Sequence, residues 1–143
     1  MAEYVYNPIQ EVEQGQNVLL NDSIPCPRGY VIHRNGSGIL TLRGIVNNSC
    51  GCFARYQVTF NGNIAVPEGG TVEEISIALA IDGEPIQTSR ARVTPAAVEN
   101  YFNVTSTAFV TVPKGCCFVT AVENTSAQTI EVQNSNLVIQ RTA

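Results

Sequence analysis

The chain has 143 residues, of which 44% are hydrophobic and only 14% charged, so it can bury the core of one domain and lacks the charge-rich composition of a disordered chain. Its formal net charge of -4 and the absence of any basic run speak against a nucleic-acid partner, and a single histidine excludes a His-rich metal centre. No apolar stretch reaches the length of a membrane span, so we expect no membrane partner.

The first 23 residues differ from the rest of the chain. They combine acidic and amide residues with scattered apolar ones, and they lack the basic region and apolar core of a secretory signal, which predicts synthesis in a cytosol. We interpret the segment up to Gln16 as an arm outside the main core and Asn17–Leu20 as a first strand. The alternative is a frayed terminus, against which the tyrosines of the segment argue. The predicted organisation is therefore an arm with a first strand over 1–23 and one domain over 24–143.

Residues 24–143 are dominated by valine, isoleucine and threonine, with turn residues about every 8–12 positions, which is typical of an all-β sandwich or barrel. The clearest strand, 74–81, alternates isoleucine and leucine with Ser76, Ala78 and Ala80, which predicts one buried face and a second face that is closely approached. Asp82-Gly83 then predicts a hairpin turn. The other expected strands cover 30–33, 39–42, 53–60 (ending at Asn61-Gly62), 64–66, 101–112, 117–122, 130–132 and 137–139.

The five cysteines leave three interpretations open; they are Cys26, Cys50, Cys52, Cys116 and Cys117. A zinc site is disfavoured because the spacing is not that of a zinc ribbon, so we expect no metal. Disulfides would need an oxidising location, the odd number leaves one thiol over, and a bond between the adjacent Cys116 and Cys117 would be strained. We favour reduced, partly buried thiols that act as small apolar residues.

No catalytic arrangement is visible, and we therefore expect neither an enzyme nor a cofactor. His33 has no orienting group or oxyanion site marked beside it, so we place it as an ordinary strand residue. Gly36-Ser37-Gly38 does not match the nucleophile elbow. The adjacent Glu73 and Glu74 would point to opposite faces of a strand, which makes a poor acid–base pair.

Low charge and many small apolar residues are typical of an obligate oligomer, whose interfaces resemble a core cut in half. The alternative is a weakly charged monomeric sandwich.

Four segments between Ala54 and Arg141 carry a resemblance to a known family: 55–60, 75–86, 110–115 and 136–141. They resemble, in order, the aromatic strand, the strand with a small hairpin, the apolar strand before a glycine turn, and the closing strand of the tumour necrosis factor-like jelly roll. This superfamily includes the complement-type globular head, and the chain is similar in particular to the heads of collagen-like bacterial spore-surface glycoproteins and their phage-encoded relatives. The resemblance implies an antiparallel jelly-roll β-sandwich.

The resemblance also implies a homotrimer with apolar and aromatic residues along its axis. The candidates for this interface are Tyr56, Phe102, Phe109 and Phe118, each of which could equally belong to the core of one chain.

A collagen-like Gly-x-y stalk is missing from the sequence, and a short arm stands in its place. We therefore expect a structural virion protein of a tailed phage, made in the bacterial host cytoplasm and located on the capsid surface, where it decorates or cements the shell or caps a short head fibre. Its partner would be the major capsid protein, and its anchors would be Tyr4, Tyr6, Pro8 and Ile9. The alternatives are an adhesive trimer that binds a host glycan or protein through 47–49 and 87–90, or a bacterial spore-surface component.

Overall fold

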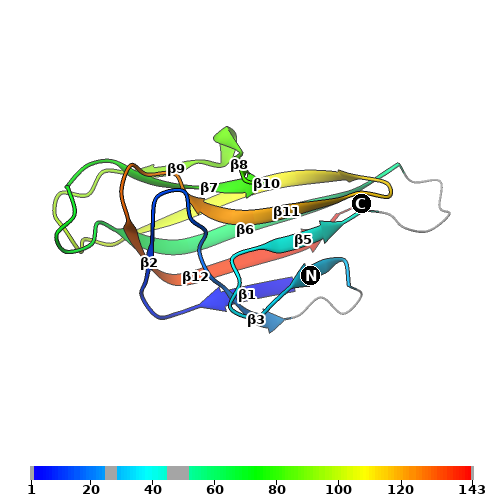
Figure 1. Ribbon diagram of the computed structural model, residues 1–143, viewed down its shortest axis with the longest axis horizontal. Helices are drawn as coiled ribbons and strands as arrows, with labels where there is room; N and C mark the ends of the chain where they lie inside the picture. The colour runs from blue at the N-terminus through cyan, green and yellow to red at the C-terminus, as the bar shows by residue number, and fades with distance from the viewer. Residues whose placement is uncertain (1, 25–28, 45–51, 143) are drawn as a thin grey trace.

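Two antiparallel β-sheets make up the protein, seen in a computed structural model that describes residues 2–24, 29–44 and 52–142 (Figure 1). The first sheet runs, in spatial order, β10 (Phe102–Pro113), β6 (Phe53–Ala65), β12 (Ile130–Arg141), β1 (Ala2–Tyr6) and β3 (Asn21–Ile24), with β2 (Gln10–Val12) beside β12. The second sheet runs β4 (Val31–His33), β5 (Leu40–Arg43), β11 (Cys117–Asn124), β7 (Ile75–Ile81) and β8 (Glu84–Pro85), with β9 (Ala91–Val93) beside β7. The predicted all-β antiparallel sandwich is confirmed.

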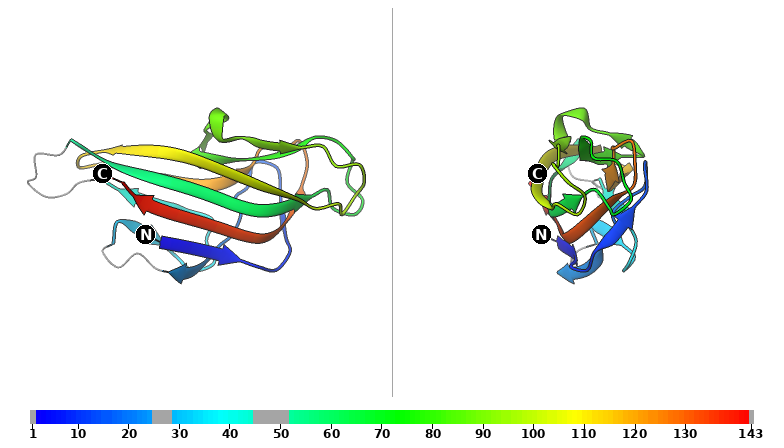
Figure 2. Two further views of the ribbon diagram at one scale, coloured as in Figure 1. Left: turned by 180° about the vertical axis from the view of Figure 1, so that it is seen from behind. Right: turned by 90° about the vertical axis from the view of Figure 1, so that its left-hand side faces the viewer.

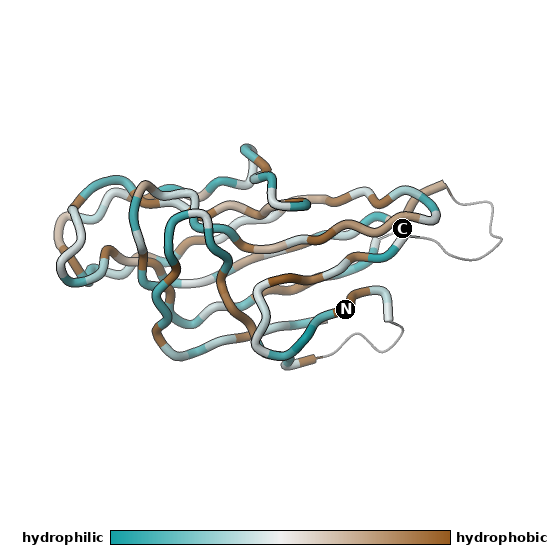
Figure 3. Tube along the Cα trace, in the orientation of Figure 1, coloured by the Kyte–Doolittle hydropathy of each residue, from teal (hydrophilic) through white to brown (hydrophobic). Residues whose placement is uncertain are grey.

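The core lies between the two sheets and is built by alternation along the strands. In β6, Ala54, Tyr56, Val58 and Phe60 are fully buried, whereas the residues between them face away from the second sheet. The same alternation brings apolar residues of most other strands into one continuous core, and brown and teal segments accordingly alternate along the trace in Figure 3. Figure 2 shows from behind and end-on how the strands enclose this interior.

The strand predicted at 74–81 is confirmed as β7, and Ser76, Ala78 and Ala80 are buried as well as the larger residues between them. Asp82 and Gly83 both have positive φ angles, 51° and 84°, as a type I′ turn requires, and Ile81 pairs with Glu84 beyond the turn.

The turn predicted at Asn61-Gly62 is wrong, because β6 continues through it to Ala65. Gly62 is needed for packing instead: a Cβ at this position would lie 2.8 Å from the ring of Phe60. The irregularity falls on the neighbouring strand, where the pairing of β12 with β6 shifts between Gln133 and Asn136. This bulge joins the two short strands predicted at 130–132 and 137–139 into one.

The N-terminal segment belongs to the sandwich, which corrects the arm expected outside the core. Strand β1 is hydrogen-bonded to β12 on one side and to β3 on the other, so no boundary between arm and domain falls at residue 23. Tyr4 is only 1% exposed, because its ring fills the core beneath this edge of the sheet. Asn17–Leu20 is not a strand: it makes one isolated bridge, from Asn17 to Glu123, and the N–H of Val18 donates to Val122.

Helical structure in the described residues is limited to one 3-10 turn, η1 (Gln87–Ser89). No helix that is long and apolar enough to span a membrane occurs within the same residues.

Candidate interaction surface

Strand β10 forms one edge of the first sheet, and among the described residues its twelve residues pair only with β6. A long open edge is normally protected by charged side chains, by proline or by a covering segment. Between Phe102 and Pro113 there is no charged residue at all, and proline stands only at the last position. The edge therefore lacks protection by charge or by internal proline, and the described segments that lie against β10 include β9 and η1, of which η1 reaches it at Ser106.

The face of β6 and β10 that points away from the second sheet is polar but almost uncharged; we call it the β6–β10 face. Its side chains bond to one another across the two strands, with Thr59 and Thr107 hydroxyls 3.2 Å apart and Thr105 donating to Asn61 over 3.1 Å. Asn103 likewise donates to Asn63 over 3.2 Å. These bonds satisfy part of the hydrogen-bonding capacity of the face, which lowers the cost of covering it.

One end of the β6–β10 face is aromatic. Phe109 is 54% exposed, and the guanidinium of Arg55, on the neighbouring strand, lies 4.7 Å from the centre of its ring. Phe53, at the start of β6, is also exposed. Sequence reasoning missed Phe53, although it shares the alternation of Arg55 and lies opposite Pro113 on β10.

The four candidate interface residues are not brought together. Tyr56 is fully buried in the core of the chain, and its hydroxyl lies 2.5 Å from the carbonyl oxygen of Arg43. Phe118 is partly buried and packs against the same core. Phe102 and Phe109 are exposed, but they lie near opposite ends of β10. Tyr56 is thus a core residue, and Phe109 is the candidate that lies on the β6–β10 face.

The four candidate anchors are also separated. Tyr4 lies in the core and Tyr6 packs against it, whereas Pro8 and Ile9 are exposed between β1 and β2. Ile9, at 51% exposure, is the one of the four that presents a large apolar surface to a partner.

His33 lies in the interior, as an ordinary strand residue can, and not beside a cysteine of the described chain. Its Nδ1 lies 2.6 Å from Oδ1 of Asp22, and its Nε2 lies 2.8 Å from the carbonyl oxygen of Ser37. Tyr4 meets the imidazole edge-on, with 4.7 Å between the ring centres. Both ring nitrogens are occupied, so the histidine is a structural group here.

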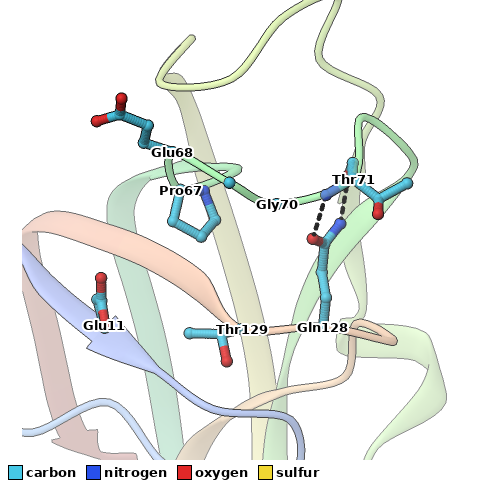
Figure 4. Close-up of a pocket in the computed structure, with 8 residues that line it drawn as sticks. Glu11, Pro67, Glu68, Gly70, Thr71, Gln128 and Thr129 are labelled. Atoms are coloured by element: carbon cyan, nitrogen blue, oxygen red, sulfur yellow. Dashed lines mark hydrogen bonds between the residues drawn. The ribbon is translucent and has the colours of Figure 1, made fainter.

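A cavity of about 420 Å³ opens at one end of the sandwich, between the loop after β6 and the loop before β12 (Figure 4). Carboxylates of Glu11 and Glu68 line it, together with Gln128, whose side-chain oxygen accepts from the N–H of Thr71 and whose amide donates back to the Thr71 carbonyl. The residues that line this cavity include hydroxyls and carboxylates but no histidine, cysteine or lysine. They do not form a nucleophile with its base.

A second cavity, of about 260 Å³, lies over the end of β11 and includes Gln87, Arg90 and Glu123. Nε of Arg90 donates to the Ser76 hydroxyl and Nη2 to the Thr125 carbonyl, which fixes the guanidinium. One carboxylate oxygen of Glu123 is buried without a hydrogen-bond partner. Burial, and secondly the nearby charge of Glu84, raise the pKa of the Glu123 carboxyl above its usual range.

The described cysteines are Cys52, Cys116 and Cys117, and all three are free and exposed. This corrects the expectation of partly buried thiols that fill the core. The reason is their position, because each lies in or beside the turns at one end of β6, β10 and β11, beyond the buried part of the strands. Cys26 and Cys50 lie outside the described residues.

No family model and no curated protein matches the sequence. Among solved structures, the globular domain of zebrafish complement 1qA protein is similar at a TM-score of 0.52 and 11% identity, over 96% of this chain and 94% of that one. The C-terminal domain of EclA, a sugar-binding protein, gives a TM-score of 0.39 at 16% identity, over 94% of this chain and 79% of that one. The chain thus has the jelly-roll fold of the complement globular head, and the likeness extends over almost all the residues of both domains.

Proposed function

We propose that the protein is a non-enzymatic structural protein that forms homotrimers through the β6–β10 face and decorates or cements the capsid of a tailed phage. One observation supports the trimer most strongly. The edge strand β10 is uncharged over its twelve residues and carries the exposed Phe109, and polar side chains of the β6–β10 face bond to one another. Burying a phenylalanine side chain stabilises an interface by about 1.5–3 kcal/mol, and a threefold arrangement repeats that contribution in each copy.

The capsid is the partner that the sequence resemblance to phage-encoded heads suggests. A trimer presents three equal contacts to a threefold point of a shell, so that a weak contact in each copy becomes strong through effective concentration. Because Tyr4 lies in the core, we assign the capsid contact to the exposed loop that contains Pro8 and Ile9. Ile9 is its apolar centre.

The trimer is tested by light scattering on the purified protein. The expected mass is about 46 kDa, three times the 15.4 kDa of one chain. Phe109→Glu places a charge in the proposed interface and should give a folded monomer. Ile32→Glu is the matched control, because Ile32 is 53% exposed, close to the 54% of Phe109, but lies on β4 of the other sheet. A monomeric wild type, or a trimer that survives Phe109→Glu, contradicts the proposed interface.

The capsid contact is tested by co-sedimentation with shells assembled from the major capsid protein of the same genome. Ile9→Asp should abolish co-sedimentation and leave the trimer intact. Ile32→Asp serves as the control, since Ile32 has a similar exposure, 53% against 51%, and lies on β4 of the second sheet. If the wild-type trimer stays in the supernatant, the capsid role fails while the trimer stands.

A binding role toward a host glycan is the second candidate, and one observation favours it. The cavity beside Glu123 is lined by Gln87 and Arg90 of the loop expected to bind a glycan. The side-chain amide of Gln87 offers a donor and an acceptor to sugar hydroxyls. Binding of the trimer on a glycan array, lost in Glu123→Ala, supports this role; a silent array together with capsid binding contradicts it.

A further inference from the structure

The three described thiols lie at the same end of the β6–β10 face as its aromatic residues. Cys52 directly precedes Phe53 on β6, and Cys116 and Cys117 follow the end of β10 at Pro113. The Lys114 N–H donates to the Cys52 carbonyl over 3.0 Å, so the two cysteine-bearing segments are bonded to each other. The tight turn after β10, which we call the β10–β11 hairpin, carries the chain from the first sheet to β11 of the second, and the two strands do not pair with each other (Figure 1).

The backbone that carries these thiols is fixed. The Cys116 N–H donates to Pro113 over 3.1 Å, and its carbonyl accepts from Gly44 over 2.9 Å. A Cβ at Gly44 would lie 2.3 Å from the Pro113 carbonyl oxygen, which shows how closely the end of β5 lies against the hairpin. The thiols are therefore presented at defined positions on the surface.

The adjacent cysteines are poor partners for each other. Their Cα atoms are about 3.8 Å apart across a trans peptide, below the separation of about 4.4 Å at which disulfides form without strain. The Cys116 sulfur instead lies 3.7 Å from the Cys117 carbonyl oxygen. A thiol of the hairpin is thus left for a partner outside the hairpin.

We propose that this end of the molecule is a cross-linking site, at which Cys52 of one copy forms a disulfide with Cys116 or Cys117 of the next copy. The proposal rests on the homotrimer inferred above, because Cys52 precedes β6 and the hairpin follows β10, the two strands that form its interface. A threefold arrangement repeats a contact between two different residues three times, so that three such bonds close the ring, whereas a bond between identical residues would join only two copies.

The bond forms by thiol–disulfide exchange with a low-molecular-weight disulfide such as oxidised glutathione. The thiolate of one cysteine attacks this disulfide, forms a mixed disulfide and releases one glutathione. The thiolate of the neighbouring copy then attacks the protein sulfur and releases the second glutathione. Two protein thiols are oxidised, one oxidised glutathione is reduced to two thiols, and the two thiol protons pass to these.

The test treats the reduced protein with oxidised glutathione, blocks remaining thiols with N-ethylmaleimide, and separates the products on a non-reducing denaturing gel. We expect a covalent trimer for the wild type and for the Cys26→Ser/Cys50→Ser control, which retains the three described thiols. Cys52→Ser and the double variant Cys116→Ser/Cys117→Ser should both lose the trimer band. Phe109→Glu should lose it together with the non-covalent trimer.

Light scattering on the same reduced samples separates the two proposals. A non-covalent trimer that yields only monomers on the gel, with an internal disulfide or with glutathione adducts, overturns the cross-link alone. A trimer band that persists in Cys52→Ser overturns it as well. A reduced wild type at the mass of one chain overturns the trimer, and the cross-link with it.

Discussion

Nδ1 of His33 lies 2.6 Å from Oδ1 of Asp22, and this contact joins β4 of the second sheet to β3 of the first. The other ring nitrogen faces the Ser37 carbonyl, so both nitrogens meet acceptors. The histidine side chain is 1% exposed, whereas that of Asp22 is 37% exposed. The ring thus connects the two layers at the edge of the sandwich.

His33→Ala should destabilise the protein by about 2 kcal/mol or more, because it removes two hydrogen bonds and leaves a cavity beside Tyr4. Urea unfolding followed by far-ultraviolet circular dichroism measures the change. Arg34→Ala, at the exposed neighbouring position, should stay within about 0.5 kcal/mol of the wild type. If His33→Ala unfolds at the same urea concentration as the wild type, the connection between the sheets contributes nothing to stability.

Gly44→Ala should lower the free energy of unfolding by about 1–3 kcal/mol, because the new methyl group would lie 2.3 Å from the Pro113 carbonyl oxygen and 2.9 Å from that of Cys116. Both atoms are backbone and cannot rotate away. The same urea unfolding checks this, with Arg43→Ala at an exposed side chain as the control. A variant as stable as the wild type would mean that the hairpin moves freely, which would also weaken the argument for fixed thiols.

The Tyr101 hydroxyl donates to Oε2 of Glu131 over 2.5 Å. Burial, and after it the bond and charge of Glu131, raise the pKa of the Tyr101 phenol well above its usual value. The folded protein then holds this proton more tightly than the unfolded chain, so the contribution to stability is complete below about pH 10 and is lost as the pH rises further. Unfolding midpoints between about pH 8 and 11 should fall less steeply in Tyr101→Phe than in the wild type. If the midpoints of the two proteins fall equally with pH, the raised pKa assigned to Tyr101 is contradicted.

Glu123 shifts stability with pH in the same sense as Tyr101, but at lower pH. Because burial and Glu84 raise the pKa of its carboxyl, the folded state favours the protonated form, and stability is lost as the pH rises through the folded pKa. Glu123→Gln should therefore raise the stability of the free protein at pH 7, with no gain at a pH below about 4. Thermal unfolding at the two pH values measures this, and Glu131→Gln, which replaces the carboxylate acceptor of Tyr101 with a neutral amide, should instead destabilise.

The strand pattern could be predicted where alternation and turn chemistry agree, as in β7 and its Asp82-Gly83 turn. The prediction of a turn at Asn61-Gly62 was wrong. A glycine at this position can either form a turn or make room for the Phe60 ring, and only the packed structure distinguishes the two. The N-terminal strand was missed because its polar residues look like those of an arm, whereas its partners lie far away in sequence.

The candidate surface was predicted only in part. Phe109 stands among outward-facing threonines, and this position in the alternation could have marked it as exposed. Tyr56 could not be assigned in the same way, since its burial follows from the second sheet and from the carbonyl of Arg43. The exposure of the cysteines likewise depends on which turns lie beyond the core.

The pairing of Ala2 with Ile139 sets the order in which the chain can fold. During synthesis β1 leaves the ribosome first, but β12, which separates it from β6, is made only after all the other strands. Until β12 is made, the middle strand of the first sheet is missing, and β6 and β1 expose hydrogen-bonding edges that β12 later covers. Because such distant pairing slows folding in general, we expect the refolding yield of this chain to fall as its concentration rises, through association at these edges.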